Sequence, residues 1–182
     1  MSDSTRMPLA TITRAPSRGM ITLRGDLDNL DLKVAASTVA GVDMVSTRQI
    51  AWGDGRGMAW MSPDEVLIFV PYDEVPSALD TFSKSLSSQH HMAVDVSDAR
   101  ACFVLDGAGV RDVLAKGTPV DLHSAVFAPG ELRRTRLGQV ACALWLRDET
   151  LAEVICFASV AEYVERWLDV AARPGAEVSY LS

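Results

Sequence analysis

An internal repeat constrains the fold of this chain more than any other feature of its sequence. Residues 20–24 have the pattern of a strand and lead through Gly25-Asp26 into a helical pattern; residues 102–105 lead through Asp106-Gly107 in the same way. In each half a hairpin then precedes a second helix, and the hairpin turns at Asp64 and Asp148 lie 84 positions apart. Two β-α-β-β-α units produce this order, and a returning strand makes each a split β-α-β, ferredoxin-like unit. The expected fold is therefore α+β with duplicated ferredoxin-like units; the alternative is a chance similarity of element order.

The repeat predicts where the chain divides. Residues 1–18 are polar and are expected to form a flexible N-terminal arm or a weak edge strand. Residues 19–97 and 98–182 are expected to be the two repeats, packed together as one domain. A chain of 182 residues is long enough to bury a substantial core. The expected strands are 20–24, 58–61, 65–71, 92–96, 101–105, 132–137, 140–146 and 151–157, and the expected helices are 28–41, 72–86, 110–116 and 159–172.

Two helix ends carry specific signals. The first helix is expected to start from Asp28 as N-cap, to bury Leu30, Val34 and Ala35 as its apolar stripe, and to stop at Gly41. The last helix has the Ser-x-x-Glu spacing of a capping box at residues 159–162.

Two predicted strands do not alternate between apolar and polar residues. Residues 66–70 and 140–146 are apolar almost throughout. A sheet with one wet face has alternating strands, so both faces of these strands are expected to be covered. The second repeat can supply that cover, and a partner chain can do so equally well.

Charge and composition exclude several classes of protein. Seventeen basic residues against 24 acidic ones give a net charge of −7, which disfavours binding to nucleic acid or to an anionic membrane surface. No apolar run reaches the length of a secretory signal or of a membrane span. Three cysteines are too few for a disulfide framework and indicate a reducing compartment. The expected location is the cytoplasm, with no nucleic-acid and no membrane partner.

The motifs that could carry chemistry are weak. The glycine clusters at 53–57 and 106–109 are more typical of turns than of phosphate loops. The histidines at 90, 91 and 123 lack the spacing of a metal site. There is no Gly-x-Ser-x-Gly elbow, and the cysteines lie in apolar strands where a thiol is inert. Residues 95–100 favour a turn over a carboxylate pair for acid–base work. We expect no catalytic residue and no metal ligand.

One basic cluster stands out in this acidic chain. Alternation along residues 132–137 places Arg134 and Arg136 on one face of a strand and Arg133 on the other. Arg134 and Arg136 could hold a carboxylate-bearing ligand, such as the tail of a folate, or the acidic patch of a partner. A solvated strand face is the simpler interpretation.

Several short motifs follow one another in a characteristic order and spacing. They are Met61-Ser62-Pro63-Asp64-Glu65, Val94-Asp95-Val96-Ser97-Asp98-Ala99-Arg100, Leu105-Asp106-Gly107, Val113-Leu114-Ala115-Lys116-Gly117, Val120-Asp121-Leu122, Phe127-Ala128-Pro129-Gly130, Arg134-Thr135-Arg136-Leu137 and Tyr163-Val164-Glu165-Arg166-Trp167-Leu168. With these motifs the chain resembles the gamma subunit family of heterotetrameric sarcosine oxidase, over nearly its whole length from about Gly19. The same segment is similar to a trimmed folate-binding domain of the glycine-cleavage aminomethyltransferase type, which implies a duplicated ferredoxin-like architecture.

The resemblance implies a role in an oxidoreductase complex that oxidatively demethylates sarcosine to glycine. It implies that the gamma chain is a non-catalytic subunit, with alpha, beta and delta subunits as partners and no cofactor of its own. FAD, FMN, NAD and tetrahydrofolate are implied for the complex. The alternative is a folate or one-carbon binding protein of the aminomethyltransferase type. Against that alternative, Val164 stands about where the folate enzymes have an acidic residue in the last helix.

Overall fold

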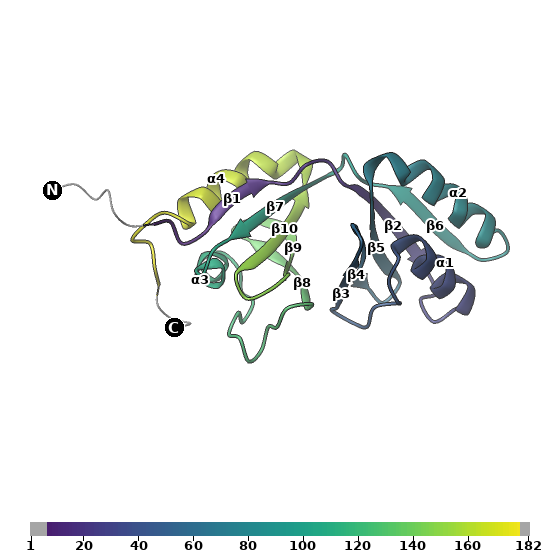
Figure 1. Ribbon diagram of the computed structural model, residues 1–182, viewed down its shortest axis with the longest axis horizontal. Coiled ribbons are helices and arrows are strands. Elements are labelled where there is room, and N and C mark those ends of the chain that lie inside the picture. The colour runs from purple at the N-terminus through teal and green to yellow at the C-terminus, as the bar shows by residue number, and fades with distance from the viewer. Residues whose placement is uncertain (1–6, 179–182) are drawn as a thin grey trace. The chain divides into compact units, whose positions relative to one another are not determined.

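The computed structural model describes residues 7–178 and divides the chain into two compact units (Figure 1). The first unit is Pro16–Ala99. The second combines Met1–Ala15 with Arg100–Ser182. The boundary before Arg100 lies within two residues of the predicted one, but the second unit also takes in a segment from the start of the chain.

The first unit is a five-stranded antiparallel sheet in the order β3-β4-β5-β2-β6, with two helices. Its elements are β2 (Gly19–Gly25), α1 (Leu30–Ala40), β3 (Ile50–Gly53), β4 (Arg56–Ser62), β5 (Glu65–Val70), the 3-10 turn η1 (Tyr72–Glu74), α2 (Val75–Ser85) and β6 (His91–Asp95). Apart from the added edge strand β3, this is the order β-α-β-β-α-β.

The second unit is also a five-stranded antiparallel sheet, in the order β1-β7-β10-β9-β8. Its elements are β1 (Thr11–Arg14), β7 (Arg100–Asp106), α3 (Val110–Ala115), β8 (Leu132–Leu137), β9 (Val140–Leu146), β10 (Leu151–Phe157), the 3-10 turn η2 (Ala158–Val160) and α4 (Ala161–Ala171). The prediction of an α+β fold is confirmed, and the structure has two antiparallel sheets.

The two sheets have the same strand order when β2 is matched with β7 and β5 with β10. The turn and helix η1–α2 recur as η2–α4 with the same lengths, 86 residues later. The returning strand differs, because β6 follows α2 in the first unit whereas β1, from the start of the chain, fills that position in the second. Figure 1 shows the purple strand β1 beside β7. The flexible arm expected at residues 1–18 is thus corrected for residues 11–14, where the stated alternative, a weak edge strand, is found. Residues 1–6 lie outside the described residues.

Each unit has its own apolar core between its sheet and its helices. In the first unit Ile21, Leu23 and Ile68 pack with Phe82 of α2, and in the second Phe103, Leu144 and Val154 pack with Leu168 of α4. All six residues of β5 are buried, as are five consecutive residues in each of β9 and β10. Because neighbouring side chains on a strand point to opposite faces, both faces of these strands are covered, as their lack of alternation predicted.

Helix α1 starts one residue later than expected, and this changes the face that it buries. Asn29 and not Asp28 is the N-cap; its Oδ1 accepts hydrogen bonds from the backbone N–H of Asp31 and of Leu32, at 2.9 and 3.2 Å. Of the three residues predicted to be buried, Leu30 and Val34 are 72% and 57% exposed, whereas Ala35 is buried. Gly41 ends the helix with φ +65°, as predicted.

The predicted capping box of the last helix is wrong. Ser159 lies within the 3-10 turn η2, so Val160 takes the N-cap position, without a side-chain hydrogen bond. Glu162 instead forms an ion pair with Arg166 one turn further on, at 2.5 Å. Strand β3 was not predicted, and β1 was expected only as the edge-strand alternative within residues 1–18.

Candidate functional site

The two arginines singled out in the sequence lie together on β8, at the edge of the second sheet. Arg134 and Arg136 are exposed, and they stand opposite Ala143 and Ala141 of β9. Arg136 donates a hydrogen bond to the carbonyl of Gln139 in the adjoining turn, at 3.1 Å. The two guanidinium groups are thus on one face of the strand, as the alternation predicted.

Arg133 points the other way and has a structural role. Its guanidinium lies 5.1 Å from the ring centroid of Phe127 and forms an ion pair with Glu131 at 3.3 Å. The other oxygen of the Glu131 carboxylate accepts from the backbone N–H of Ala128 at 2.7 Å. These contacts connect β8 to the loop before it.

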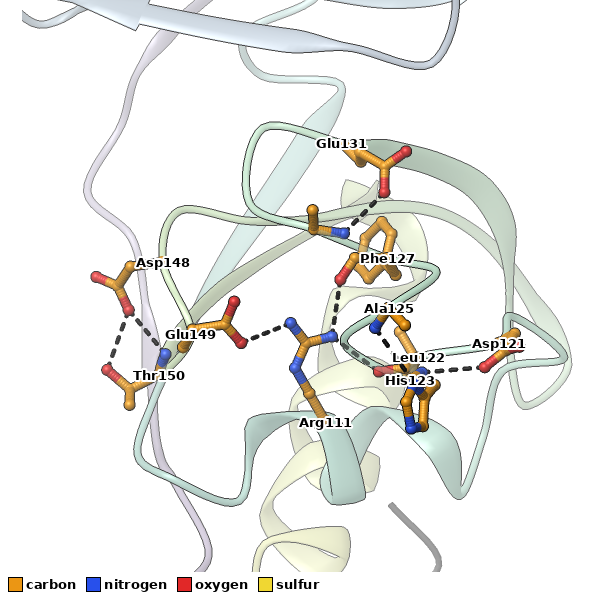
Figure 2. A network of polar contacts seen from close by, with 11 residues as sticks. Arg111, Asp121, Leu122, His123, Ala125, Phe127, Glu131, Asp148, Glu149 and Thr150 are labelled. Carbon is orange, nitrogen blue, oxygen red and sulfur yellow. Dashed lines mark hydrogen bonds and ion pairs between the residues drawn. The ribbon is translucent and has the colours of Figure 1, made fainter. Parts of the chain in front are cut away.

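That loop is held by an arginine that the sequence analysis did not identify (Figure 2). Arg111, on α3, donates through Nη1 to the carbonyls of Leu122 and Phe127, at 2.8 Å each, and through Nη2 to the carboxylate of Glu149 at 2.7 Å. Its side chain is only 12% exposed. Arg111 therefore ties both ends of the segment 122–127 to α3. No motif marks an arginine that binds backbone carbonyls, since the acceptors are present at every residue.

The turn at residues 148–150 next to this cluster is closed by its own side chains (Figure 2). The Asp148 carboxylate accepts from the backbone N–H of Thr150 at 2.7 Å and from its hydroxyl at 3.0 Å. These hydrogen bonds favour the charged form and lower the pKa of Asp148. Asp148 therefore stabilises the turn of the hairpin between β9 and β10.

Several of the residues considered as metal ligands or nucleophiles are buried or hydrogen-bonded within the fold. His123 Nδ1 accepts from the backbone N–H of Ala125 at 3.2 Å. Within residues 7–178 no three His, Cys, Asp or Glu side chains come close enough to hold a metal ion. Cys142 and Cys156 face each other across β9 and β10, and burial raises the pKa of Cys142 to about 12 and that of Cys156 to about 11. Both thiols are protonated at neutral pH and are poor nucleophiles.

The carboxylates at residues 95–98 belong to a turn. The Ser97 hydroxyl donates to Asp95 at 2.5 Å and accepts from the backbone N–H of Met20 at 2.9 Å. Asp98 accepts from the Tyr72 hydroxyl at 3.0 Å, and this hydrogen bond raises the pKa of Tyr72. The glycine cluster at 53–57 likewise forms the hairpin between β3 and β4, with its turn at Asp54-Gly55.

An apolar groove of about 720 Å³ runs along the outer side of α4. Tyr163, Trp167 and Val170 line it from the helix, with Lys116 and Ala176 at its margins. Tyr163 is 42% exposed and Val170 53% exposed. This combination of exposed aromatic and aliphatic side chains is typical of a surface that binds another protein.

No helix in the part of the chain that the structure describes is both long and apolar enough to cross a membrane. With its two antiparallel sheets, the chain has the architecture of a folate-binding-like α+β domain. It aligns over 93% of its length with 48% of the glycine cleavage system aminomethyltransferase T from Bartonella henselae, at 12% identity and a TM-score of 0.64. The regulatory subunit of aspartate kinase from Thermus thermophilus is similar in fold at 16% identity and a TM-score of 0.52, covering 90% of this chain and 99% of that one.

The family is more specific than the fold. The model of the sarcosine oxidase, gamma subunit family matches residues 24–174, so the chain belongs to this family. In the heterotetrameric sarcosine oxidase from Corynebacterium sp. U-96, solved in complex with pyrrole 2-carboxylate, one chain is 26% identical, with a TM-score of 0.80 over 90% of this chain and 83% of that one. No curated protein sequence matches the chain.

Proposed function

We propose that the chain is the gamma subunit of a heterotetrameric sarcosine oxidase and acts in it as a non-catalytic, structural component. The observation that carries this proposal is the family match over residues 24–174 together with the similarity to a chain of the Corynebacterium complex. The complex would oxidatively demethylate sarcosine to glycine in the cytoplasm. The neighbours of this chain would be the alpha, beta and delta subunits.

The environments of the polar side chains support a structural role. Three groups are the most suited to chemistry, and each has another role. The Cys142 thiol is protonated at neutral pH, the Asp95 carboxylate accepts a hydrogen bond within a turn, and the His123 ring accepts one from the backbone. We therefore assign FAD, FMN, NAD and tetrahydrofolate to the other subunits and none of them to this chain.

Co-expression tests the proposal. The chain is produced with the alpha, beta and delta subunits from the same genome, one large subunit carries the affinity tag, and the eluate is separated by size-exclusion chromatography. We expect this chain to co-elute with the flavin absorbance at constant stoichiometry. We expect the chain alone to show no flavin absorbance and no sarcosine oxidation. A chain that elutes apart from the large subunits contradicts the proposal.

A second candidate function, folate binding, rests on Arg134 and Arg136, which share one exposed face of β8. Two guanidinium groups at this spacing suit the carboxylates of a folate tail. Calorimetric titration of the chain with tetrahydrofolate tests this role, with the R134Q/R136Q variant as control. Heat of binding that the variant loses supports it, and a flat trace for the unmodified chain removes it.

A further inference from the structure

We propose that the groove along α4 is the docking site for an apolar helix of another subunit of the complex, with a carboxylate that faces Lys116 and Arg166. This inference rests on the proposed function, because it assumes that the chain is one subunit of a larger assembly. It adds the surface and the kind of partner segment, which the family match does not specify.

The internal repeat provides a control for α4 within the same chain. Helices α2 and α4 have equal length and follow equivalent 3-10 turns. With the offset of 86 residues, the three buried positions of α2, at Val75, Ala78 and Phe82, match Ala161, Val164 and Leu168 of α4. Helix α4 buries one further residue, Ala171, in its last turn. The two helices therefore turn the same face toward their sheets.

The outward faces differ. Where α2 has Ser77, Thr81 and Lys84, α4 has Tyr163, Trp167 and Val170. A helix in this position of the fold thus needs no apolar side chains on that face. Tyr163, Trp167 and Val170 are spaced i, i+4 and i+7, which is the spacing by which one helix receives another.

The groove exists because the helix beside α4 is short. Helix α1, beside α2, has 11 residues, whereas α3 has 6. Five residues fewer shorten the helix by about 7.5 Å. The corresponding hollow between α1 and α2 has a volume of about 240 Å³, against about 720 Å³ for the groove. From Tyr163 to Val170 the groove is about 10 Å long, enough for two turns of a docked helix.

Two glycines allow the aromatic side chains to lie flat against the unit. A Cβ at Gly117 would come within 2.3 Å of the Trp167 ring, and one at Gly138 within 2.5 Å of the Tyr163 hydroxyl. The loops that carry these glycines are joined by a hydrogen bond of 2.8 Å from the N–H of Gly138 to the carbonyl of Gly117. The aromatic floor of the groove is therefore held in place before any partner binds, which lowers the entropic cost of binding.

The charges around the groove specify the partner further. Lys116, Arg166 and Glu162 line it, a net of one positive charge in a chain of net charge −7. Arg166 is 77% exposed and pairs with Glu162 at 2.5 Å, and Lys116 Nζ donates to the carbonyl of Ala171 at 2.5 Å. Each cation has further N–H donors, which a carboxylate on the docked helix can use. Apolar residues of the same helix would cover Tyr163 and Val170.

The experiment measures the Kd of the fluorescently labelled chain for the complex assembled without it. In Y163S/V170K the two exposed apolar residues of the groove take the identities of their α2 counterparts, Ser77 and Lys84. The matched control is L30S/V34K, which makes equivalent changes to the exposed apolar pair on α1. We expect Y163S/V170K to raise Kd by at least about tenfold, as for residues central to an interface, and L30S/V34K to leave it within about twofold. R166Q should raise Kd more at low salt than at high salt. Both double variants should melt within about 2 °C of the unmodified chain, because they alter surface positions.

The outcomes separate this inference from the proposed function. If the unmodified chain does not bind the complex, the proposed function fails first. If it binds and Y163S/V170K binds equally well, the inference is overturned while the function stands. It is also overturned if the chain forms a dimer that Y163S/V170K abolishes, because a second copy then fills the groove. A deletion of residues 179–182 that tightens binding of the complex tenfold would instead assign the groove to the chain's own C-terminus, and would overturn it too.

Discussion

The contacts of Arg111 predict that one residue on α3 determines the stability of the second unit. We expect R111M, which keeps the apolar stem and removes the guanidinium, to lower the free energy of unfolding by about 3 kcal/mol. The two hydrogen bonds to the carbonyls of Leu122 and Phe127 are charge-assisted, and such bonds contribute about 1.5–3 kcal/mol each. Leu122 and Phe127 are buried. When Arg111 is removed, however, the loop loosens and water can hydrogen-bond to their carbonyls. The contributions of the two hydrogen bonds therefore do not add in full.

The ion pair with Glu149 contributes much less. The Glu149 side chain is 62% exposed, and ion pairs of that kind are worth about 1 kcal/mol or less. E149Q is therefore expected to cost less than about 1 kcal/mol. R111K keeps the charge, but an ammonium group cannot reach all three acceptors, so its cost should be close to that of R111M.

Native-state hydrogen exchange of the β10 amides measures this quantity for the second unit alone. In R111M we expect the opening free energy of β10 to fall by about 3 kcal/mol, and the amides of residues 122–127 to lose their protection. The β5 amides of the first unit serve as the internal reference. An E149Q variant that loses as much as R111M, or an R111M variant that loses less than about 1 kcal/mol, would refute the reasoning that the backbone carbonyls are the important partners.

Three further predictions follow from single positions. G138A places a Cβ at φ +56° and 2.5 Å from the Tyr163 hydroxyl; it should cost about 2 kcal/mol in urea unfolding, and adding Y163F should restore part of this. N29A removes the α1 cap and should lower the melting temperature by the equivalent of about 1 kcal/mol. D28A is the control and should have a smaller effect; equal losses in the two variants would contradict the observed N-cap. Burial on folding raises the pKa of Cys142 from 9.0 to about 12. The folded chain therefore holds a proton that the unfolded chain releases above pH 9, and the free energy of unfolding falls as the pH rises from 9 toward 12. C142A should make this fall less steep, and an identical slope in both proteins would disprove the assignment.

The sequence identified the strands whose ends are marked by turn residues. Strands β8, β9 and β10 have the predicted bounds because Gly138-Gln139 and the 147–150 turn separate them. Strand β1 was expected only as an alternative to a flexible arm and without bounds, since three of its four residues are exposed and an edge strand of this kind has no apolar pattern. Only the pairing with β7, about 90 residues away, makes it a strand.

Errors in the helices arose from local competition that a pattern does not resolve. Asp28 and Asn29 are both good N-cap residues, and the choice of Asn29 rotates the buried face by one position, about 100°. Strand alternation located Arg134 and Arg136 correctly on one face, because that inference needs only the pleat. Arg111 was missed because its partners are main-chain carbonyls brought near by the loop, and their positions depend on the tertiary fold.

The repeat allows fold requirements and functional features to be separated within one chain. Positions at which the two units agree, such as Phe82 and Leu168 against their sheets, are sufficiently explained by packing. Differences between equivalent positions need another cause, because the strand order and the helix register are the same in both units. Two such differences lie in the second unit: its returning strand comes from the start of the chain, and its last helix has an aromatic outer face beside a shortened α3. The first alters only the connectivity, since β1 occupies the place of β6. The second exposes apolar surface at a cost in solvation that the fold does not require, and a bound partner helix would recover that cost.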